Sequence, residues 1–218
     1  MAQVFRPAAS TIALLVIALL GATPILLVGI GYSLMRSSYV TNQSVTREQP
    51  VPFSHAHHVG GLGLDCRYCH TSVTTASFAG IPPTETCMTC HSQLWTNAAM
   101  LAPVRESLAA NKPIHWQRVD VLPDYVYFDH SIHVGKGVAC EECHGRVDRM
   151  PMMQREASLD MQWCLACHRD AARHLRPRGQ VFAMQSAAAP SDAEAQRLAR
   201  ENQLLDQRRL TDCSTCHR

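Results

Sequence analysis

An uncharged apolar run fills residues 12–34, with the sequence IALLVIALLGATPILLVGIGYSL. A helix over this run would be about 35 Å long, which is enough to cross a bilayer with some tilt. Its glycines and Pro24 are tolerated in membrane helices. A cleaved signal peptide is the alternative, but its apolar core is usually about 7–15 residues long. We therefore expect residues 1–36 to form an uncleaved transmembrane anchor.

The rest of the chain is more polar and contains one clear amphipathic segment, residues 191–210, which reads SDAEAQRLARENQLLDQRRL. Ser191 and Glu194 form a capping box at its start, directly after a proline. The apolar positions on one side of this segment are Ala195, Leu198, Ala199 and Leu205. This pattern predicts one soluble helix that leads into the last part of the chain.

The most unusual feature of the composition is its ten cysteines and twelve histidines. All ten cysteines fall in C-x-x-C pairs, and a histidine follows every pair. The cysteines are Cys66 and Cys69, Cys87 and Cys90, Cys140 and Cys143, Cys164 and Cys167, and Cys213 and Cys216. The histidines that follow them are His70, His91, His144, His168 and His217.

C-x-x-C-H is the attachment motif of c-type haem. The two thiols bond to the two vinyl groups on one edge of the porphyrin, and the next residue points its imidazole at the iron. Zinc ribbons and disulfides also use C-x-x-C, but neither requires a histidine after every pair. The motifs therefore predict five covalent c-type haems, each with one proximal histidine ligand.

Haem attachment also predicts where the chain resides, because c-type haem is attached outside the cytoplasm. We expect a single-pass protein of the inner (cytoplasmic) membrane, with its N-terminus inside and its haem domain on the periplasmic side. The charges around the apolar run do not decide this orientation, since Arg6 precedes it and Arg36 and Arg47 follow it.

Two stretches of the chain repeat each other. Residues 53–70 read FSHAHHVGGLGLDCRYCH and residues 128–144 read FDHSIHVGKGVACEECH, with one extra residue in the first copy. A second C-x-x-C-H follows each copy, which indicates duplication of a two-haem unit. The predicted organisation is an anchor (1–36), a linker (37–52), a first repeat (53–127), a second repeat (128–176) and a C-terminal helix with the fifth haem (177–218).

The repeated F-x-H-x-x-H supplies candidates for the distal iron ligands. These are His55 and His58 in the first copy and His130 and His133 in the second. Histidines three residues apart share one face of a helix, so each pair can serve two neighbouring irons. His57 occupies the place of Ile132 in the other copy, and we treat it as a non-ligand.

The fifth haem has no third copy of this motif to serve it. Candidates for its distal ligand are Met150, His115, His174 and Met184, or its iron is five-coordinate. A thioether ligand raises the potential, although methionines also fill gaps around cofactors. Among these candidates we prefer Met150.

Size and charge complete the expected fold class. About 180 residues follow the apolar run, or roughly 36 per haem, so the haems themselves must form much of the core. We expect a mostly irregular multihaem cytochrome c with short α-helices wrapped around five haems, plus one transmembrane helix. A net charge of +2 argues against a nucleic-acid partner.

The F-x-H-x-x-H motif before C-x-x-C-H resembles the class III multihaem cytochromes c. The stretches PIHWQRVDVLPDYVYFDHSIHV at 113–134 and MQWCLACHR at 161–169 look like those of the pentahaem subunit of alternative complex III. One departure is Asp120, where many relatives carry histidine.

This resemblance implies an electron-transfer subunit with no catalytic residues of its own, in a membrane complex that oxidises quinol. Its implied partners are iron–sulfur and integral-membrane subunits. The electrons would leave to a cytochrome c, a copper protein or a terminal oxidase of the respiratory chain.

Two other functions remain open from the sequence. A stand-alone membrane-anchored quinol dehydrogenase would feed a periplasmic reductase, and would need a quinol pocket beside its first haem. A catalytic multihaem reductase would need an open iron. No C-x-x-C-K motif occurs in the chain, and histidines are available to cap at least four irons.

Overall fold

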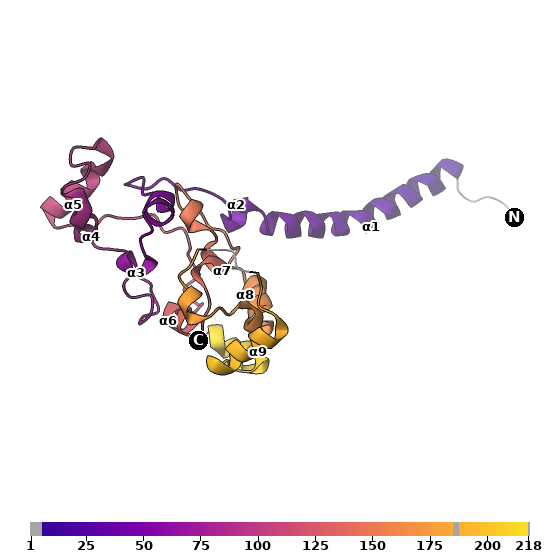
Figure 1. Cartoon of the computed structure of the whole chain (residues 1–218). Coiled ribbons are helices and arrows are strands. Elements are labelled where there is room, and N and C mark those ends of the chain that lie inside the picture. The colour runs from indigo at the N-terminus through magenta and orange to yellow at the C-terminus, as the bar shows by residue number, and fades with distance from the viewer. Residues whose placement is uncertain (1–5, 185–187, 218) are drawn as a thin grey trace. The chain divides into compact units, whose positions relative to one another are not determined.

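The computed structural model describes residues 6–184 and 188–217 (Figure 1). Residues 1–5 of the predicted anchor, and residues 185–187 and 218 of the predicted C-terminal segment, lie outside the described residues. The chain divides into two compact units, the first ending at Gln43 and the second beginning at Ser44.

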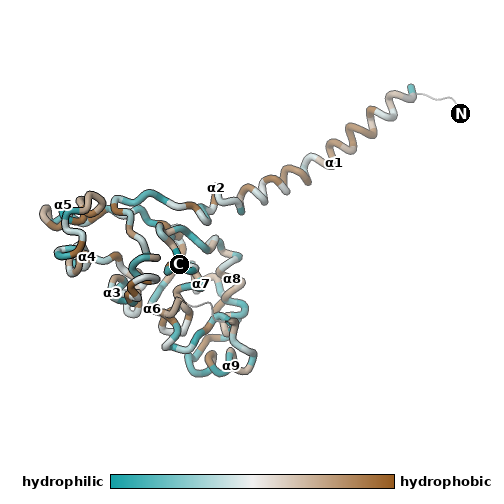
Figure 2. Tube along the Cα trace, turned by 45° about the horizontal axis from the view of Figure 1, so that its top comes forward, coloured by the Kyte–Doolittle hydropathy of each residue, from teal (hydrophilic) through white to brown (hydrophobic). Residues whose placement is uncertain are grey.

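The first unit consists of helices α1 (Pro7–Met35) and α2 (Ser38–Thr41). The predicted apolar run lies within α1, and the helix continues through Pro24. The segment Ala8–Met35 has a mean hydropathy of 2.6 and is long enough to cross a membrane. Figure 2 shows the apolar colouring along its length. By length and composition α1 fits either a membrane anchor or a signal sequence.

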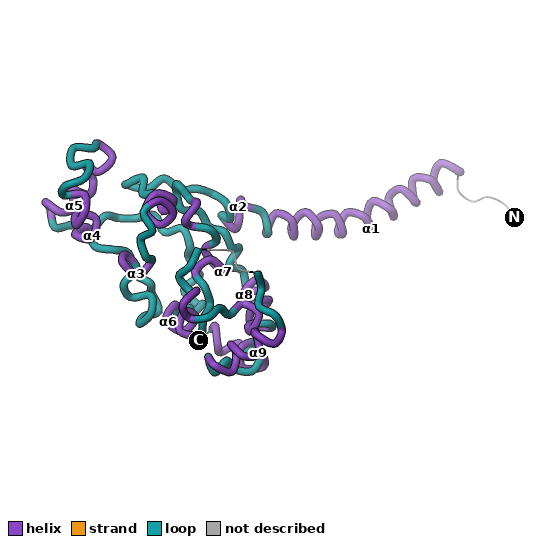
Figure 3. Tube along the Cα trace, viewed as in Figure 1, coloured by secondary structure: helices purple, strands orange, loops and turns teal. Residues whose placement is uncertain are grey.

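The second unit contains short helices joined by long loops (Figure 3). Within the described residues it has no strands and only three isolated β-bridges, Thr46 with Gln154, Val126 with His217 and Val138 with Leu175. Its α-helices are α3 (Cys66–Cys69), α4 (Thr84–His91), α5 (Ala102–Ala110), α6 (His130–Gly135), α7 (Cys140–His144), α8 (Met161–Arg169), α9 (Asp192–Glu201), α10 (Gln207–Leu210) and α11 (Cys213–Cys216). Its other helical turns are η1 (Ala56–Gly61), η2 (Ala99–Leu101), η3 (Val147–Arg149), η4 (Ala171–His174) and η5 (Arg178–Gln180). The predicted fold class, irregular with short helices, is confirmed.

The predicted helix over 191–210 is wrong in one respect, because the segment forms two helices, α9 and α10. Ser191 caps α9 as expected, since its hydroxyl accepts a hydrogen bond from Glu194 N. The chain turns after α9 because Gln203 adopts a positive φ of 50°. The ammonium group of Lys136 donates to the backbone oxygens of Asn202 and Gln203 at 2.8 and 3.2 Å. This lysine stabilises the helix end at the point where the amphipathic pattern would continue.

The buried apolar residues of the second unit form small clusters. One consists of Val51, Leu101 and Val104, and another of Val147, Met150 and Met184. Gly60 allows η1 to lie against η3, because a Cβ atom at this position would collide with the carbonyl of Asp148. The side chains alone therefore provide little core, as the ratio of residues to haem motifs predicts.

Replacing Leu198 with alanine is expected to lower the free energy of unfolding by about 2–5 kcal/mol, because the side chain on α9 is buried and leaves a cavity. Leu198 is 2% exposed, whereas Leu205, predicted for the same apolar side, is 48% exposed. The control variant Leu205→Ala should change the unfolding free energy by no more than about 0.5 kcal/mol. Denaturant unfolding of the detergent-solubilised protein measures both values, and equal losses would contradict the assignment of the buried face.

Candidate haem-binding sites

Each C-x-x-C-H motif lies on or ends a short helix, α3, α4, α7, α8 or α11. Aspartates cap three of these helices: the side chains of Asp65, Asp160 and Asp212 accept hydrogen bonds from backbone N–H groups of Arg67, Trp163 and Ser214. Residues i and i+3 of a helix lie on one face. The two thiols of each motif can therefore reach one edge of a single macrocycle.

Three pairs of histidines face each other at nearly the same spacing. The ring centroids of His58 and His91 are 6.2 Å apart, those of His130 and His144 are 6.3 Å apart, and those of His133 and His168 are 6.2 Å apart. Two imidazoles that bind one metal from opposite sides, each through a bond of about 2 Å, place their centroids roughly 6 Å apart. These three pairs therefore have the spacing that an iron between two histidines requires.

The second nitrogen of these rings supports the same interpretation. A metal-binding histidine almost always donates its other N–H to a carbonyl or a carboxylate. In eight of the nine histidines predicted as iron ligands, Nδ1 has such a partner. This leaves Nε2 of each ring available to bind a metal. The partners are Ser54 O for His58, Gly80 O for His70, Leu94 O for His91, Ser77 O for His130, Asp129 O for His133, Asp120 Oδ2 for His144, Leu210 O for His168 and Tyr125 O for His217.

His55 is the exception among the nine. Its Nδ1 is buried without a hydrogen-bond partner. Burial and then the nearby charge of His70 lower the pKa of His55 to about 4, so the ring is neutral. In the second copy His130 faces His144, and the equivalent residues of the first copy are His55 and His70. Among the charged neighbours of His55, His70 has the largest effect on its pKa.

The F-x-H-x-x-H motif has the same geometry in both copies. Phe53 stacks on His58 with ring centroids 4.4 Å apart and meets His55 edge-on at 4.9 Å. Phe128 stacks on His133 at 4.5 Å and meets His130 edge-on at 4.7 Å. The phenylalanine thus holds both imidazoles of each copy in fixed orientations.

The first copy carries its histidines at a π-helical turn, η1, and the second carries them on the α-helix α6. A π-turn contains one more residue than an α-turn. The extra residue that the sequence shows in the first copy is therefore accommodated beside the histidines without changing their spacing.

The two copies of the repeat contact each other through equivalent residues, as two halves related by an internal twofold axis do. Ala56 N donates to Met150 O at 3.0 Å, and the equivalent Ser131 N donates to Ala76 O at 3.2 Å. Each histidine turn is thus bonded to the loop that follows the other copy's first haem motif. The equivalent cysteines Cys66 and Cys140 contact each other. A contact between equivalent residues is expected at the axis of a twofold interface.

Further contacts place the five haem motifs in a row whose spatial order differs from their order along the sequence. The Tyr68 hydroxyl of the first motif bonds to Thr89 Oγ1 of the second at 2.7 Å. Cys66 of the first motif contacts Cys140 of the third. Burial and then the neighbouring Cys167 of the fourth motif raise the pKa of Cys143 to about 12.

The fourth and fifth motifs complete the row. His168 Nδ1 bonds to Leu210 O at 2.7 Å, just before the fifth motif, and burial followed by Cys216 raises the pKa of Cys164. The spatial order is therefore second, first, third, fourth, fifth. Figures 1 and 2 show the part of this order that their labels mark, since α4 lies at one end of this unit and α3, α6 and α7 lie between it and α8.

The fifth motif is held by the segment that precedes α6. Tyr127 N donates to Cys216 O at 2.8 Å, and the Tyr125 ring stacks on His217 with centroids 5.9 Å apart. The preferred distal ligand Met150 is 7% exposed, and it lies in the cluster that packs against Cys66 and Cys140. The distal ligand of this site stays a prediction.

Two of the other candidates for that ligand have different surroundings. His174 Nδ1 lies 3.1 Å from Glu142 Oε2, and this hydrogen bond raises the pKa of His174. His115 is exposed. Met184 lies in the same buried cluster as Met150.

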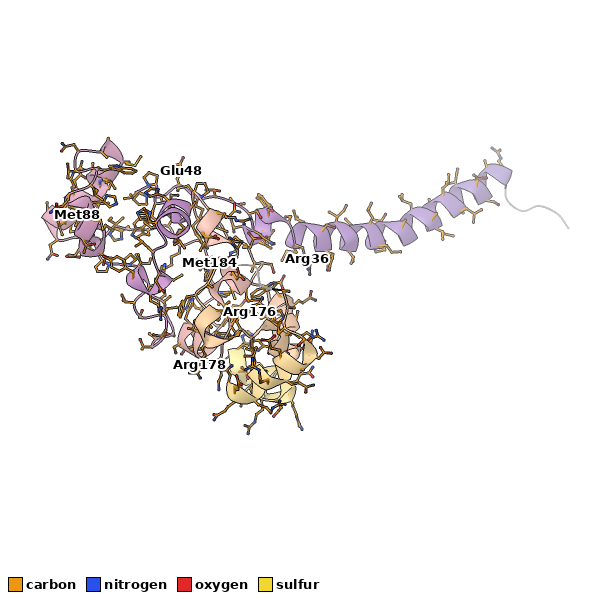
Figure 4. The ribbon with its side chains drawn as sticks, in the orientation of Figure 1. Arg36, Glu48, Met88, Arg176, Arg178 and Met184 are labelled. Atoms are coloured by element: carbon orange, nitrogen blue, oxygen red, sulfur yellow. The ribbon has the colours of Figure 1, made fainter. Side chains whose placement is uncertain are left out.

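Sequence reasoning missed a group of partly buried polar contacts around the third motif. Arg176, labelled in Figure 4, is 9% exposed and donates to Glu142 Oε1 at 2.8 Å. Asp120 accepts from His144 at 2.8 Å. The partners are 34 and 24 residues apart in sequence, so no local spacing could have indicated them.

The alternatives for C-x-x-C have no counterpart in the described structure. No disulfide joins any of the ten cysteines, all of which lie within the described residues. Throughout residues 6–184 and 188–217, no group of three or more His, Cys, Asp or Glu side chains could hold a metal ion by themselves. The facing histidine pairs instead fit a metal that arrives with its own equatorial ligands, as the iron of haem does.

Comparisons with known proteins agree with this chemistry. Residues 126–218 match the family described as cytochrome c7 and related cytochrome c. The chain is 34% identical over 127 residues to the "Menaquinone reductase, multiheme cytochrome c subunit" of Nitratidesulfovibrio vulgaris (strain Hildenborough). The alignment covers 58% of this chain and 54% of that relative, so the chain spans about half the relative's length. Residues 126–218 are thus a cytochrome c7-like multihaem cytochrome domain, in a chain homologous to a multihaem cytochrome c subunit of a menaquinone reductase.

Proposed function

We propose that this chain is the pentahaem electron-transfer subunit of a membrane quinol:acceptor oxidoreductase of the alternative complex III type. The observation that carries the proposal is α6, a single helix whose His130 and His133 face the proximal histidines of two different motifs. Such a helix would provide one ligand to each of two neighbouring irons. With five motifs in a row, this is the arrangement of an electron carrier with several centres.

The chain's own residues would position the cofactors. When bound, each haem supplies an iron that takes up and releases one electron. The cysteine pairs would fix the edge of each macrocycle, and the histidines would hold each iron along one axis. The Nδ1 hydrogen bonds would fix the orientation of the imidazoles, and Cys66 and Cys140 would bring the two central haems close together.

Two observations support a location at the membrane: helix α1 and the similarity to the menaquinone reductase subunit. The apolar helix is long enough to anchor the chain, and the relative is named as a subunit of a menaquinone reductase. We propose an N-terminus inside, a periplasmic haem domain, and electrons received from iron–sulfur and integral-membrane subunits. A small soluble carrier or a terminal oxidase would accept them.

Purification from native membranes in mild detergent, with mass spectrometry of the proteins that remain bound, tests the assignment to a complex. Recovery together with polytopic membrane subunits and an iron–sulfur protein is expected. Recovery alone, or with a single soluble reductase, would contradict it and favour a stand-alone quinol dehydrogenase.

The name of the relative favours a second candidate, in which the same row of haems delivers electrons to the quinone. Adding oxidised menaquinone to the pre-reduced complex distinguishes the two directions. The first proposal predicts that the haems stay reduced, and the second predicts that their absorption returns to the oxidised form.

A further inference from the structure

The two central motifs are equivalent by the internal twofold, but their proximal histidines have different partners. His70 Nδ1 lies 2.7 Å from the backbone carbonyl oxygen of Gly80. The equivalent His144 Nδ1 lies 2.8 Å from the carboxylate oxygen Oδ2 of Asp120. The other three proximal histidines, His91, His168 and His217, also bond to backbone carbonyls. Asp120 is therefore the one carboxylate among the five proximal partners.

The surroundings of Asp120 keep this carboxylate in place. Its side chain is 18% exposed, and that of His144 is 31% exposed. The second oxygen, Oδ1, lies 3.8 Å from Nε of Arg155, whose side chain is 12% exposed. Arg155 in turn donates to the backbone oxygen of Val121, the next residue after Asp120, at 2.8 Å. The arginine thus lies beside the carboxylate and fixes the segment that carries it.

We propose that Asp120 lowers the reduction potential of the haem held by Cys140–His144 below that of its symmetry mate held by Cys66–His70. This inference rests on the proposed haem-binding function.

The physical reason is the strength of the hydrogen bond to the proximal imidazole. A bond to a carboxylate is roughly twice as strong as a neutral one, and it makes the imidazole a more basic ligand. A more basic ligand, with a negative charge behind it, stabilises ferric iron over ferrous iron. Reduction adds one electron to the iron and breaks no bond, so the whole effect appears in the potential.

The consequence is a difference in reduction potential between the two haems in the middle of the row. The twofold would otherwise give the two central haems similar ligands and similar surroundings. Because Asp120 breaks this equivalence, an electron shared between them resides mainly on the haem of Cys66–His70. Asp120 acts through His144 and is a positioning residue that tunes the potential.

Redox titration of the full chain in detergent, followed by haem absorption, tests the inference. In Asp120→Asn, one of the five potentials should rise so that its reduction equilibrium changes by about tenfold, or about 59 mV for one electron. Asp120→Glu keeps the carboxylate and should stay near the wild type. Asp124→Asn removes the same charge from an exposed position in the same segment and should leave unchanged the potential that Asp120→Asn raises.

The outcomes separate this inference from the proposed function. An Asp120→Asn protein that retains all its haems and shows no shifted potential would overturn the role of Asp120 and leave the haem assignment intact. A wild-type protein whose Cys140–His144 peptide carries no haem by mass would overturn the proposed function itself.

Electron paramagnetic resonance of the oxidised wild-type protein gives a second reading that needs no variant. One low-spin ferric signal should show a narrower spread of g values than the others, because a more basic imidazole strengthens the axial ligand field. The absence of such a signal would count against the inference even if Asp120→Asn failed to assemble.

Discussion

Replacing His133 with alanine is expected to convert one low-spin haem, the one attached through Cys164 and Cys167, to the high-spin form. Replacing His130 should do the same to the haem attached through Cys140 and Cys143. The reason is that each imidazole faces a proximal histidine at a centroid distance of 6.2 or 6.3 Å. Its loss leaves the iron with an open axial position. Electron paramagnetic resonance measures the change as the loss of one low-spin signal in each variant.

A matched control is available in the first copy. His57 is not a predicted ligand, and its ring stacks on Trp95 with centroids 5.8 Å apart. His57→Ala should therefore leave every low-spin signal in place. If His130→Ala and His133→Ala both kept the wild-type spectrum, the ligand assignment would be wrong.

Removing the first haem, by replacing Cys66 and Cys69 with alanine, is expected to interrupt electron transfer along the row. The remaining four haems would then form one isolated haem and one connected group of three. The spatial order places the second motif at one end of the row, with the first motif beside it. Without the first haem, the haem of Cys87–His91 loses its neighbour. Rapid mixing of the assembled complex with menaquinol should then reduce either one haem or three haems, and never all four.

The equivalent variant of the second motif provides the control. Replacing Cys87 and Cys90 removes the end of the row, so menaquinol should reduce all four remaining haems or none. Dithionite should reduce all four in both variants, which confirms that the haems are present. If the haems followed the order of the chain, the two variants would exchange their results, and that outcome would overturn the spatial order.

The local chemistry of the sites was predictable because it depends on neighbouring residues. The spacing of the histidines in F-x-H-x-x-H placed two imidazoles on one face of a turn, and the structure brings three such imidazoles to proximal histidines at the same spacing. The repeat also predicted the equivalence of the copies, which the paired hydrogen bonds from Ala56 and Ser131 display.

The spatial order of the motifs and the partner of His144 were not predictable, because they depend on contacts between distant segments. The contact between Cys66 and Cys140 comes from the way the two copies pair, and sequence similarity does not show how they pair. Asp120 appeared in the sequence only as a departure from a pattern, and only the fold brings it to His144.

The continuous helix predicted over 191–210 was wrong for a similar reason. The amphipathic pattern extends past Glu201, but Lys136 from another part of the chain binds the carbonyls where α9 ends. A local pattern indicates where a helix is favourable. It does not contain the distant side chain that stabilises its end.

The most direct test of the account is peptide mass spectrometry of the protein purified from its native host. All five C-x-x-C-H peptides are expected to carry a covalent haem, including Cys140–His144 at the centre of the row. Peptides with unmodified thiols at these motifs would contradict it, because without haem the facing histidine pairs would have no iron to hold.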